Sequence, residues 1–125
     1  MLLTHRLVEN DVLLVRLLPV LSIRSRAAAT LALEELTAAY APRHLVLEIP
    51  GIPTPAAVSV ILRATRSCGL QGRVLTVVAL AAATRLLLRD NLPADGPAVH
   101  ATTEEALNAL RRTGGQPEPE PAPGG

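Results

Sequence analysis

The segment from His44 to Gly69 constrains the fold of this chain more than any other. Its first part, Leu45 to Ile49, is a short apolar run whose length and branched side chains favour a β-strand. Pro53 and Pro55 follow, remove two backbone donors and hold the chain extended. Helical periodicity then begins at Pro55, which suits a first helical turn, and Gly69 is expected just past the helix end. A strand, a tight loop and a helix predict half of a βαβ unit.

The rest of the chain continues this alternation of strands and helices. Strands are expected over residues 1–9, 12–18, 73–78 and 98–100, and helices over residues 26–40, 81–90 and 102–112. The order ββαβαβαβα predicts an α/β fold, with a mixed sheet of four or five strands and helices packed on it. The first two strands are expected to form an antiparallel hairpin, and Leu45–Ile49 to be the central strand.

Apolar spacing predicts which side of each helix packs on the sheet. Thr102 and Glu105 also match a capping box at the start of the last helix, with Thr102 as the cap and Glu105 reaching back. The residues expected to face inward are Ala29, Leu33, Leu36 and Tyr40 in the first helix, Val58, Ile61, Leu62 and Thr65 in the second, Ala83, Leu86 and Leu87 in the third, and Ala106, Leu107 and Leu110 in the fourth.

Composition divides the 125 residues into one domain and a tail. The domain is expected over residues 1–112, and its core must be aliphatic because Tyr40 is the only aromatic residue. Residues 113–125 consist of Thr, Gly, Gln, Pro, Glu and a single Ala. Such a segment has too little apolar surface to fold, and we expect it to be a disordered tail.

Charge and hydropathy argue against several classes of partner. The formal net charge is +1, so no strong field attracts nucleic acid or an anionic membrane. The longest uncharged run, 74–84, is too short to span a bilayer, and Arg16 interrupts the only apolar stretch that resembles a signal peptide. The single Cys68 excludes an internal disulfide. We therefore expect a cytoplasmic protein, and the use of Arg without Lys indicates a bacterial origin.

Catalytic signatures are missing from the sequence. It has neither G-x-G-x-x-G nor a phosphate-binding loop with Lys, and its three histidines are far apart. No enzyme activity, cofactor or metal site is therefore expected. Glu48, the one charge within an apolar strand, is interpreted as facing solvent or pairing with an arginine, with a functional carboxylate as the alternative. Cys68 is interpreted as a structural, half-buried thiol.

The order and spacing of these segments resemble a STAS domain, the fold of bacterial anti-sigma factor antagonists. The resemblance covers about residues 7–112 and is most specific over Leu45–Ala64, which looks like the family's strand, loop and helix around an Asp-Ser-Ser-Gly motif. Residues 69–78 resemble the family's next strand with its leading glycine. Residues 100–107 resemble its closing strand and helix.

The chain departs from the family at the residues that matter for regulation. Thr54, Pro55, Ala56 and Ala57 occupy the Asp-Ser-Ser-Gly positions. In the family, a partner anti-sigma kinase phosphorylates the first serine, and Pro55 offers no hydroxyl there. No phosphorylation is therefore expected, although Thr54 and Ser59 are the two hydroxyls that could substitute. The family's Gly-x-Leu-Asp turn is also altered, with Leu18 or Pro19 in place of Gly and Ser22 in place of Asp.

The resemblance implies a non-catalytic regulatory module in transcription signalling. It would bind an anti-sigma factor with a kinase-like fold and would lack the usual serine phosphoswitch. Two alternatives stay open: a domain that senses a small molecule or nucleotide, and a structural subunit of a larger regulatory assembly. Whether the chain forms a homodimer also stays open. The expected partner-binding residues are Pro53, Thr54, Pro55, Ala56, Ala57 and Val58.

Overall fold

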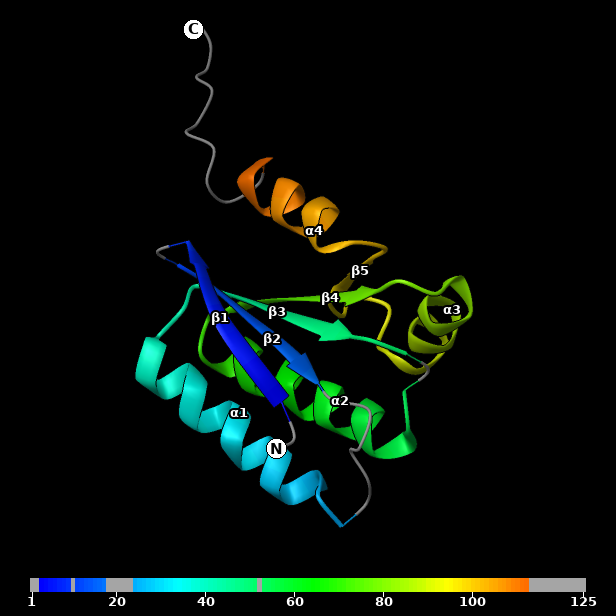
Figure 1. Cartoon of the computed structure of the whole chain (residues 1–125), viewed down its shortest axis with the longest axis horizontal. Coiled ribbons are helices and arrows are strands. Elements are labelled where there is room, and N and C mark those ends of the chain that lie inside the picture. Colours follow the sequence, from blue (N-terminus) through cyan, green and yellow to red (C-terminus); the bar gives the residue numbers. More distant parts are fainter. Residues whose placement is uncertain (1–2, 10, 18–23, 52, 113–125) are drawn as a thin grey trace, which may run out of the picture.

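The computed structural model describes residues 3–9, 11–17, 24–51 and 53–112. The strands are β1 (Leu3–Glu9), β2 (Val12–Leu17), β3 (His44–Ile49), β4 (Val74–Ala79) and β5 (Ala98–His100). The helices are α1 (Arg26–Tyr40), α2 (Pro55–Leu70), α3 (Ala82–Asn91) and α4 (Thr103–Leu110) (Figure 1). This is the predicted order ββαβαβαβα, and the α/β fold class is confirmed. The altered turn at residues 18–22 and the tail over 113–125 lie outside the described residues.

The five strands form one sheet in the order β1-β2-β3-β4-β5. β1 pairs antiparallel with β2, and the other neighbours are parallel. β3 is therefore the central strand, as predicted, and its Leu45 lies between Leu13 of β2 and Leu75 of β4. A central parallel strand is covered on both faces, which explains its nearly continuous apolar sequence.

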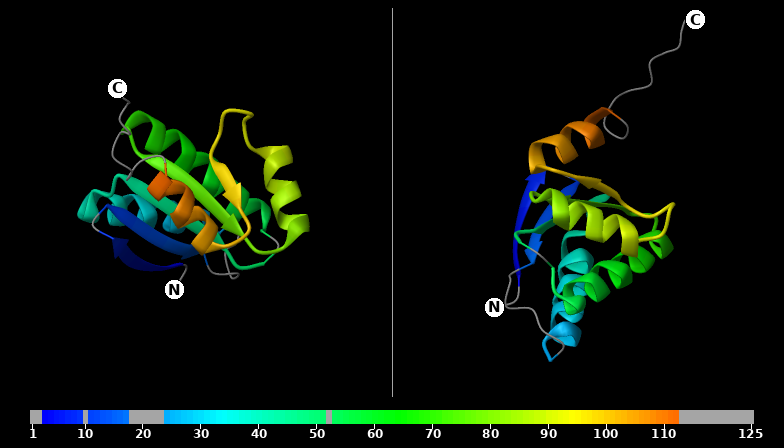
Figure 2. Two further views of the ribbon diagram at one scale, coloured as in Figure 1. Left: turned by 90° about the horizontal axis from the view of Figure 1, so that it is seen from above. Right: turned by 90° about the vertical axis from the view of Figure 1, so that its right-hand side faces the viewer.

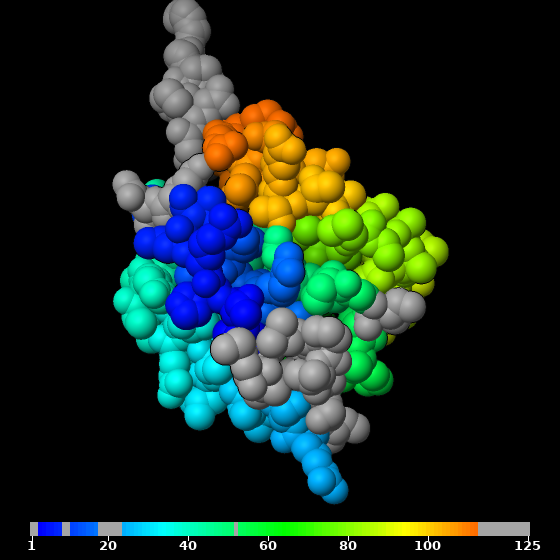
Figure 3. Space-filling model, viewed as in Figure 1, coloured from blue at the N-terminus to red at the C-terminus, as the bar shows by residue number. Residues whose placement is uncertain are grey.

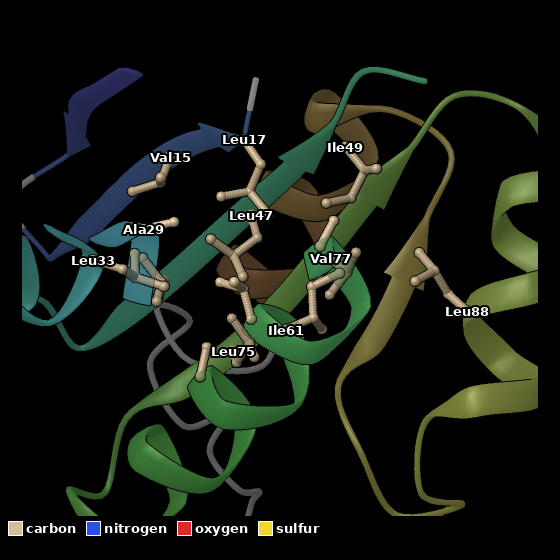
Figure 4. Close-up of a cluster of buried hydrophobic side chains, with 14 of the residues drawn as sticks. Val15, Leu17, Ala29, Leu33, Leu47, Ile49, Ile61, Leu75, Val77 and Leu88 are labelled. Atoms are coloured by element: carbon tan, nitrogen blue, oxygen red, sulfur yellow. The ribbon is translucent and has the colours of Figure 1, made fainter. Parts of the chain in front are cut away.

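Helices cover the two faces of the sheet unequally. α1 and α2 lie side by side on one face, α4 lies on the other, and α3 stands beside β5 (Figures 1 and 2). The space-filling view shows α4 (orange) and α1 (cyan) on opposite sides of the sheet (Figure 3). The larger core, between the sheet and α1 and α2, consists of aliphatic side chains and Cys68, and includes Leu47, Ile61 and Val77, each fully buried (Figure 4). A smaller cluster under α4 includes Val46, Ala106 and Leu110.

The predicted inward faces of α1 and α2 are partly wrong. In α1, Ala29 and Leu33 are buried, but Thr37 takes the place expected for Tyr40, which is 42% exposed. The hydroxyl of Thr37 donates to the carbonyl of Glu34, so its burial leaves no unpaired donor. In α2, Ile61 is buried but Leu62 is exposed, because the helix packs through a narrow face of mostly small residues. That face consists of Ala56, Ala57, Val60, Ile61, Ala64 and Cys68.

The prediction for α3 is wrong, and the one for α4 is confirmed with one difference. α3 touches the sheet through Thr84 and Leu88, while Ala83, Leu86 and Leu87 are exposed. Burial of Thr84 is compatible with its polarity because its hydroxyl donates to the carbonyl of Gly51, 3.3 Å away. In α4, Ala106 and Leu110 are buried as predicted, and Leu107 is half-buried.

The helix ends test the capping predictions. Pro55 begins α2, as predicted, but Gly69 lies inside the helix, which continues to Leu70. Gly72 takes the left-handed conformation instead, with φ +72°. At α4, Thr102 Oγ1 accepts from the backbone N–H of Glu105 at 3.1 Å, as a capping box requires. The Glu105 carboxylate reaches one residue further back than predicted and accepts from the N–H of Ala101.

Candidate partner-binding site

The candidate site is the amino-terminal end of α2, which follows the carboxyl end of the central strand β3. Crevices at the carboxyl ends of parallel strands are frequent sites of function in α/β sheets. The connection before α2 is tied to α3 by the hydrogen bond from Thr84 to the carbonyl of Gly51. The connection before α2 is therefore attached both to the sheet, through β3, and to α3.

Thr54 and Pro55 together set the start of α2. Thr54 is the N-cap, with extended backbone at φ −76° and ψ 162°, as expected for a residue before proline. Its Oγ1 accepts from the N–H of Ala57 at 3.1 Å, and its carbonyl accepts from the N–H of Val58. The hydroxyl of Thr54 therefore has a structural task in capping the helix.

The six predicted partner-binding residues are not equally accessible. Pro53, Ala56 and Ala57 are buried, with Ala56 only 2% exposed. Thr54 is half-buried, and Val58 is half-buried and packs against the main core. Pro55 alone is exposed. The small residues Ala56 and Ala57 thus serve the packing of α2 on the sheet, a role that the apolar periodicity did not predict.

Two residues beyond the predicted set complete the outer face of this helix end. Ser59 and Leu62 lie four and seven residues after Pro55, on the same side of α2, and Leu62 is 38% exposed. The first turn of α2 contains no acidic residue. The partial positive charge of the helix end is therefore not offset by its own side chains. In the described residues, the outer face of this helix end is formed by Pro55, Val58, Ser59 and Leu62, which we call the α2 face.

Glu48 lies on the opposite face of the sheet and has no part in the α2 face. Its Oε1 accepts from Arg16 Nε at 3.1 Å, which confirms the predicted pairing with an arginine. The hydroxyl of Thr103, in the first turn of α4, donates to the other carboxylate oxygen of Glu48. Arg16 and Thr103 could not be named in advance, because each lies more than thirty residues away along the chain.

The surroundings of Cys68 and of His44 shift the pKa of each group. Burial raises the pKa of the Cys68 thiol, against the opposing charge of Arg73. Burial, and then Arg43, lower the pKa of His44, while Asp11 acts in the opposite direction. Both shifts favour the neutral form, so neither group is primed as a nucleophile or a charged ligand. Within the described ranges, no three His, Cys, Asp or Glu residues gather as a metal site would require.

Comparison with known proteins assigns the fold. No family model and no curated protein sequence matches the chain. A solved structure, a serine-to-glutamate variant of RsbS from Moorella thermoacetica, matches with a TM-score of 0.75 and 18% sequence identity, and the match covers 91% of this chain and 98% of that one. The chain therefore has the STAS fold, which the sequence resemblance predicted. None of its helices, within the described ranges, is long and apolar enough to cross a membrane.

Proposed function

We propose that this chain is a non-catalytic regulatory module that binds a protein partner through the α2 face. The single observation that carries the proposal is the STAS fold shared with RsbS over 91% of the chain, with an exposed Pro55 at the start of α2. The partner that the resemblance implies is an anti-sigma factor with a kinase-like fold. The module would then act in bacterial transcription signalling in the cytoplasm.

The chemistry of the α2 face supports docking by apolar contact and by the helix end. Pro55 and Leu62 expose apolar surface, and Val58 adds part of its side chain. The partial positive charge of this helix end favours an acidic group on the partner close to the first turn of α2. An added phosphate at this point would compete with such a group, which is the logic of a phosphoswitch.

We further propose that this module lacks the serine phosphoswitch. Pro55 has no hydroxyl at the position where the resemblance places the acceptor. The hydroxyl of Thr54 is held by the N–H of Ala57, and modification there would remove the cap of α2. Ser59 lies inside the second helical turn, where a kinase would have to unwind the backbone to reach it. Binding would therefore be constitutive or set by protein abundance.

Substitution of Leu62 tests the docking surface. We expect Leu62→Asp to weaken binding to an anti-sigma kinase of the host by about tenfold or more in calorimetry, since it places a charge in an apolar contact. Leu70→Asp is the matched control, because Leu70 is 84% exposed at the other end of the same helix. Val58 and Ala56 are poor test positions because both pack against the core. Equal affinity of the two variants would refute the α2 face as the docking surface.

A further inference from the structure

A groove of about 490 Å³ lies between α1 and α2, away from the sheet. Arg26, Thr30 and Glu34 of α1 follow one another at four-residue spacing along one wall. Ser59 and Arg63 of α2 form the other wall. The volume lies in the range of sites for small molecules, which is about 300–1,000 Å³.

Two arginines line this groove without a carboxylate bound to them. Among the residues that the structure describes, the side chains of Arg26 and Arg63 make no ion pair and no hydrogen bond, whereas the side chain of Arg16 is paired with Glu48. Glu34 lines the same groove, but its carboxylate is not within ion-pairing distance of either arginine. The groove is therefore lined by two positively charged residues, one from each helix, and by a single carboxylate.

The hydroxyl of Thr30 is a second polar feature of the groove. Other helical threonines donate a hydrogen bond: Thr65 and Thr37 donate to carbonyls of their own helices, and Thr84 donates to the carbonyl of Gly51. Thr30 Oγ1 is buried, and within the described part of the chain it has no hydrogen-bond partner. An unpaired buried hydroxyl costs folding free energy, so its retention calls for a reason. Thr30 lies where the groove meets a small apolar hollow of about 20 Å³ that Cys68 also lines.

We propose that the groove between α1 and α2 binds a small phosphate monoester whose organic part carries a hydroxyl or amine. Arg26 and Arg63 bind the phosphate, because the planar guanidinium fork matches its oxygens. Glu34 accepts a hydrogen bond from the organic part, and Thr30 supplies a hydroxyl at the base of the groove. This site shares Ser59 with the α2 face, but it includes neither Pro55 nor Leu62 and does not depend on the proposed partner docking.

Titration of the full chain with two probes tests the site. Amide NMR spectra at low salt are followed with inorganic phosphate and with glycerol phosphate. We expect saturable shifts confined to residues 26–34 and 59–63, and tighter binding of glycerol phosphate. Arg63→Gln should weaken binding by about tenfold, the cost of one charged hydrogen-bond partner. Arg66→Gln, an exposed arginine on α2 outside the groove, should leave it unchanged.

The Glu34→Gln variant distinguishes a binding site from two charged helix surfaces that are only solvated. The variant should bind inorganic phosphate more tightly, because a repelling carboxylate is gone, and should lose part of the preference for glycerol phosphate. Thr30→Val should raise the thermal midpoint and weaken both probes, since it removes the unpaired hydroxyl. Shifts that do not saturate, or equal losses in Arg63→Gln and Arg66→Gln, would overturn the proposal. An unchanged response of Glu34→Gln to both probes would do the same.

Discussion

Arg16 and Glu48 are register partners in the parallel β2–β3 ladder, and their side chains join across it with Arg16 Nε 3.1 Å from Glu48 Oε1. Glu48 also accepts from the hydroxyl of Thr103, so one carboxylate connects β2, β3 and the first turn of α4. The side chain of Glu48 is 15% exposed, whereas that of Arg16 is 55% exposed. The two partners therefore contribute unequally to the stability of the domain.

Substitution of Glu48 is expected to cost more than substitution of Arg16. Glu48→Ala removes two hydrogen bonds at a largely buried position, and should lower the free energy of unfolding by about 1–3 kcal/mol. Arg16→Ala breaks an exposed ion pair and should cost about 1 kcal/mol or less. Urea unfolding of both variants measures the difference. A larger loss for Arg16→Ala would show that Glu48 does not hold α4 to the sheet.

Stability should decrease on mild acidification because of His44. Burial and Arg43 lower the pKa of folded His44, whereas the unfolded chain protonates near the ordinary value of 6.5. The unfolded state therefore binds more protons as the pH falls below about 6.5, and the free energy of unfolding falls with it until folded His44 is itself protonated. Well above pH 6.5, the contribution of neutral, buried His44 to the free energy of unfolding is fully present. Urea unfolding across this range should show the slope in the wild type.

His44→Gln should flatten that pH dependence, and His5→Gln serves as the control because His5 is exposed. Among the described residues, the buried Nδ1 of His44 has no hydrogen-bond partner. Burial without a partner disfavours the charged form of the ring, which explains why folded His44 resists protonation. Retention of the full slope in His44→Gln would assign the acid sensitivity to other groups.

The thiol of Cys68 should react slowly in the native protein. Cys68 is 4% exposed, and burial raises its pKa, so both access and the thiolate fraction are low. We expect Ellman's reagent at mildly alkaline pH to label it more than tenfold more slowly than in denaturant. Labelling at the rate of a free peptide thiol would show that the core between α1 and α2 opens readily.

Removal of the tail should leave the domain as stable as before. Residues 113–125 offer almost no apolar surface to pack, and the smaller core under α4 is already closed by Leu110. A chain ending at Arg112 should unfold at the same thermal midpoint as the full chain. A clear fall in that midpoint would mean that the tail docks on the domain.

The central unit of the fold could be predicted because its signals are local. An apolar run between prolines marked β3, and Pro55 with the following periodicity marked the start of α2. The faces of α2 and α3 were harder, since periodicity gives most weight to large side chains such as Leu62, Leu86 and Leu87. The actual contacts use Ala56, Ala57 and Thr84, whose small size lets the helices approach the sheet and the Gly51 carbonyl closely.

The candidate site, too, was only partly predictable from the sequence. Pro55 was expected in the first turn of α2 and lies there, whereas the role of Thr54 as the helix cap was not predicted. The burial of Pro53, Ala56 and Ala57 depends on how α2 rotates on the sheet, and sequence spacing alone does not determine that rotation. The Arg16–Glu48–Thr103 contacts likewise depend on strand register and on the return of α4 to the sheet.

Restoring a hydroxyl at position 55 tests whether this module lacks a phosphoswitch. The wild type and Pro55→Ser are each bound to an anti-sigma kinase of the host, ATP and Mg²⁺ are added, and intact mass and the fraction still bound are measured. We expect the wild type to gain no phosphate and to stay bound, and Pro55→Ser to gain one phosphate and dissociate. A gain of one phosphate by the wild type, mapped to Thr54 or Ser59 and accompanied by release, would contradict the account.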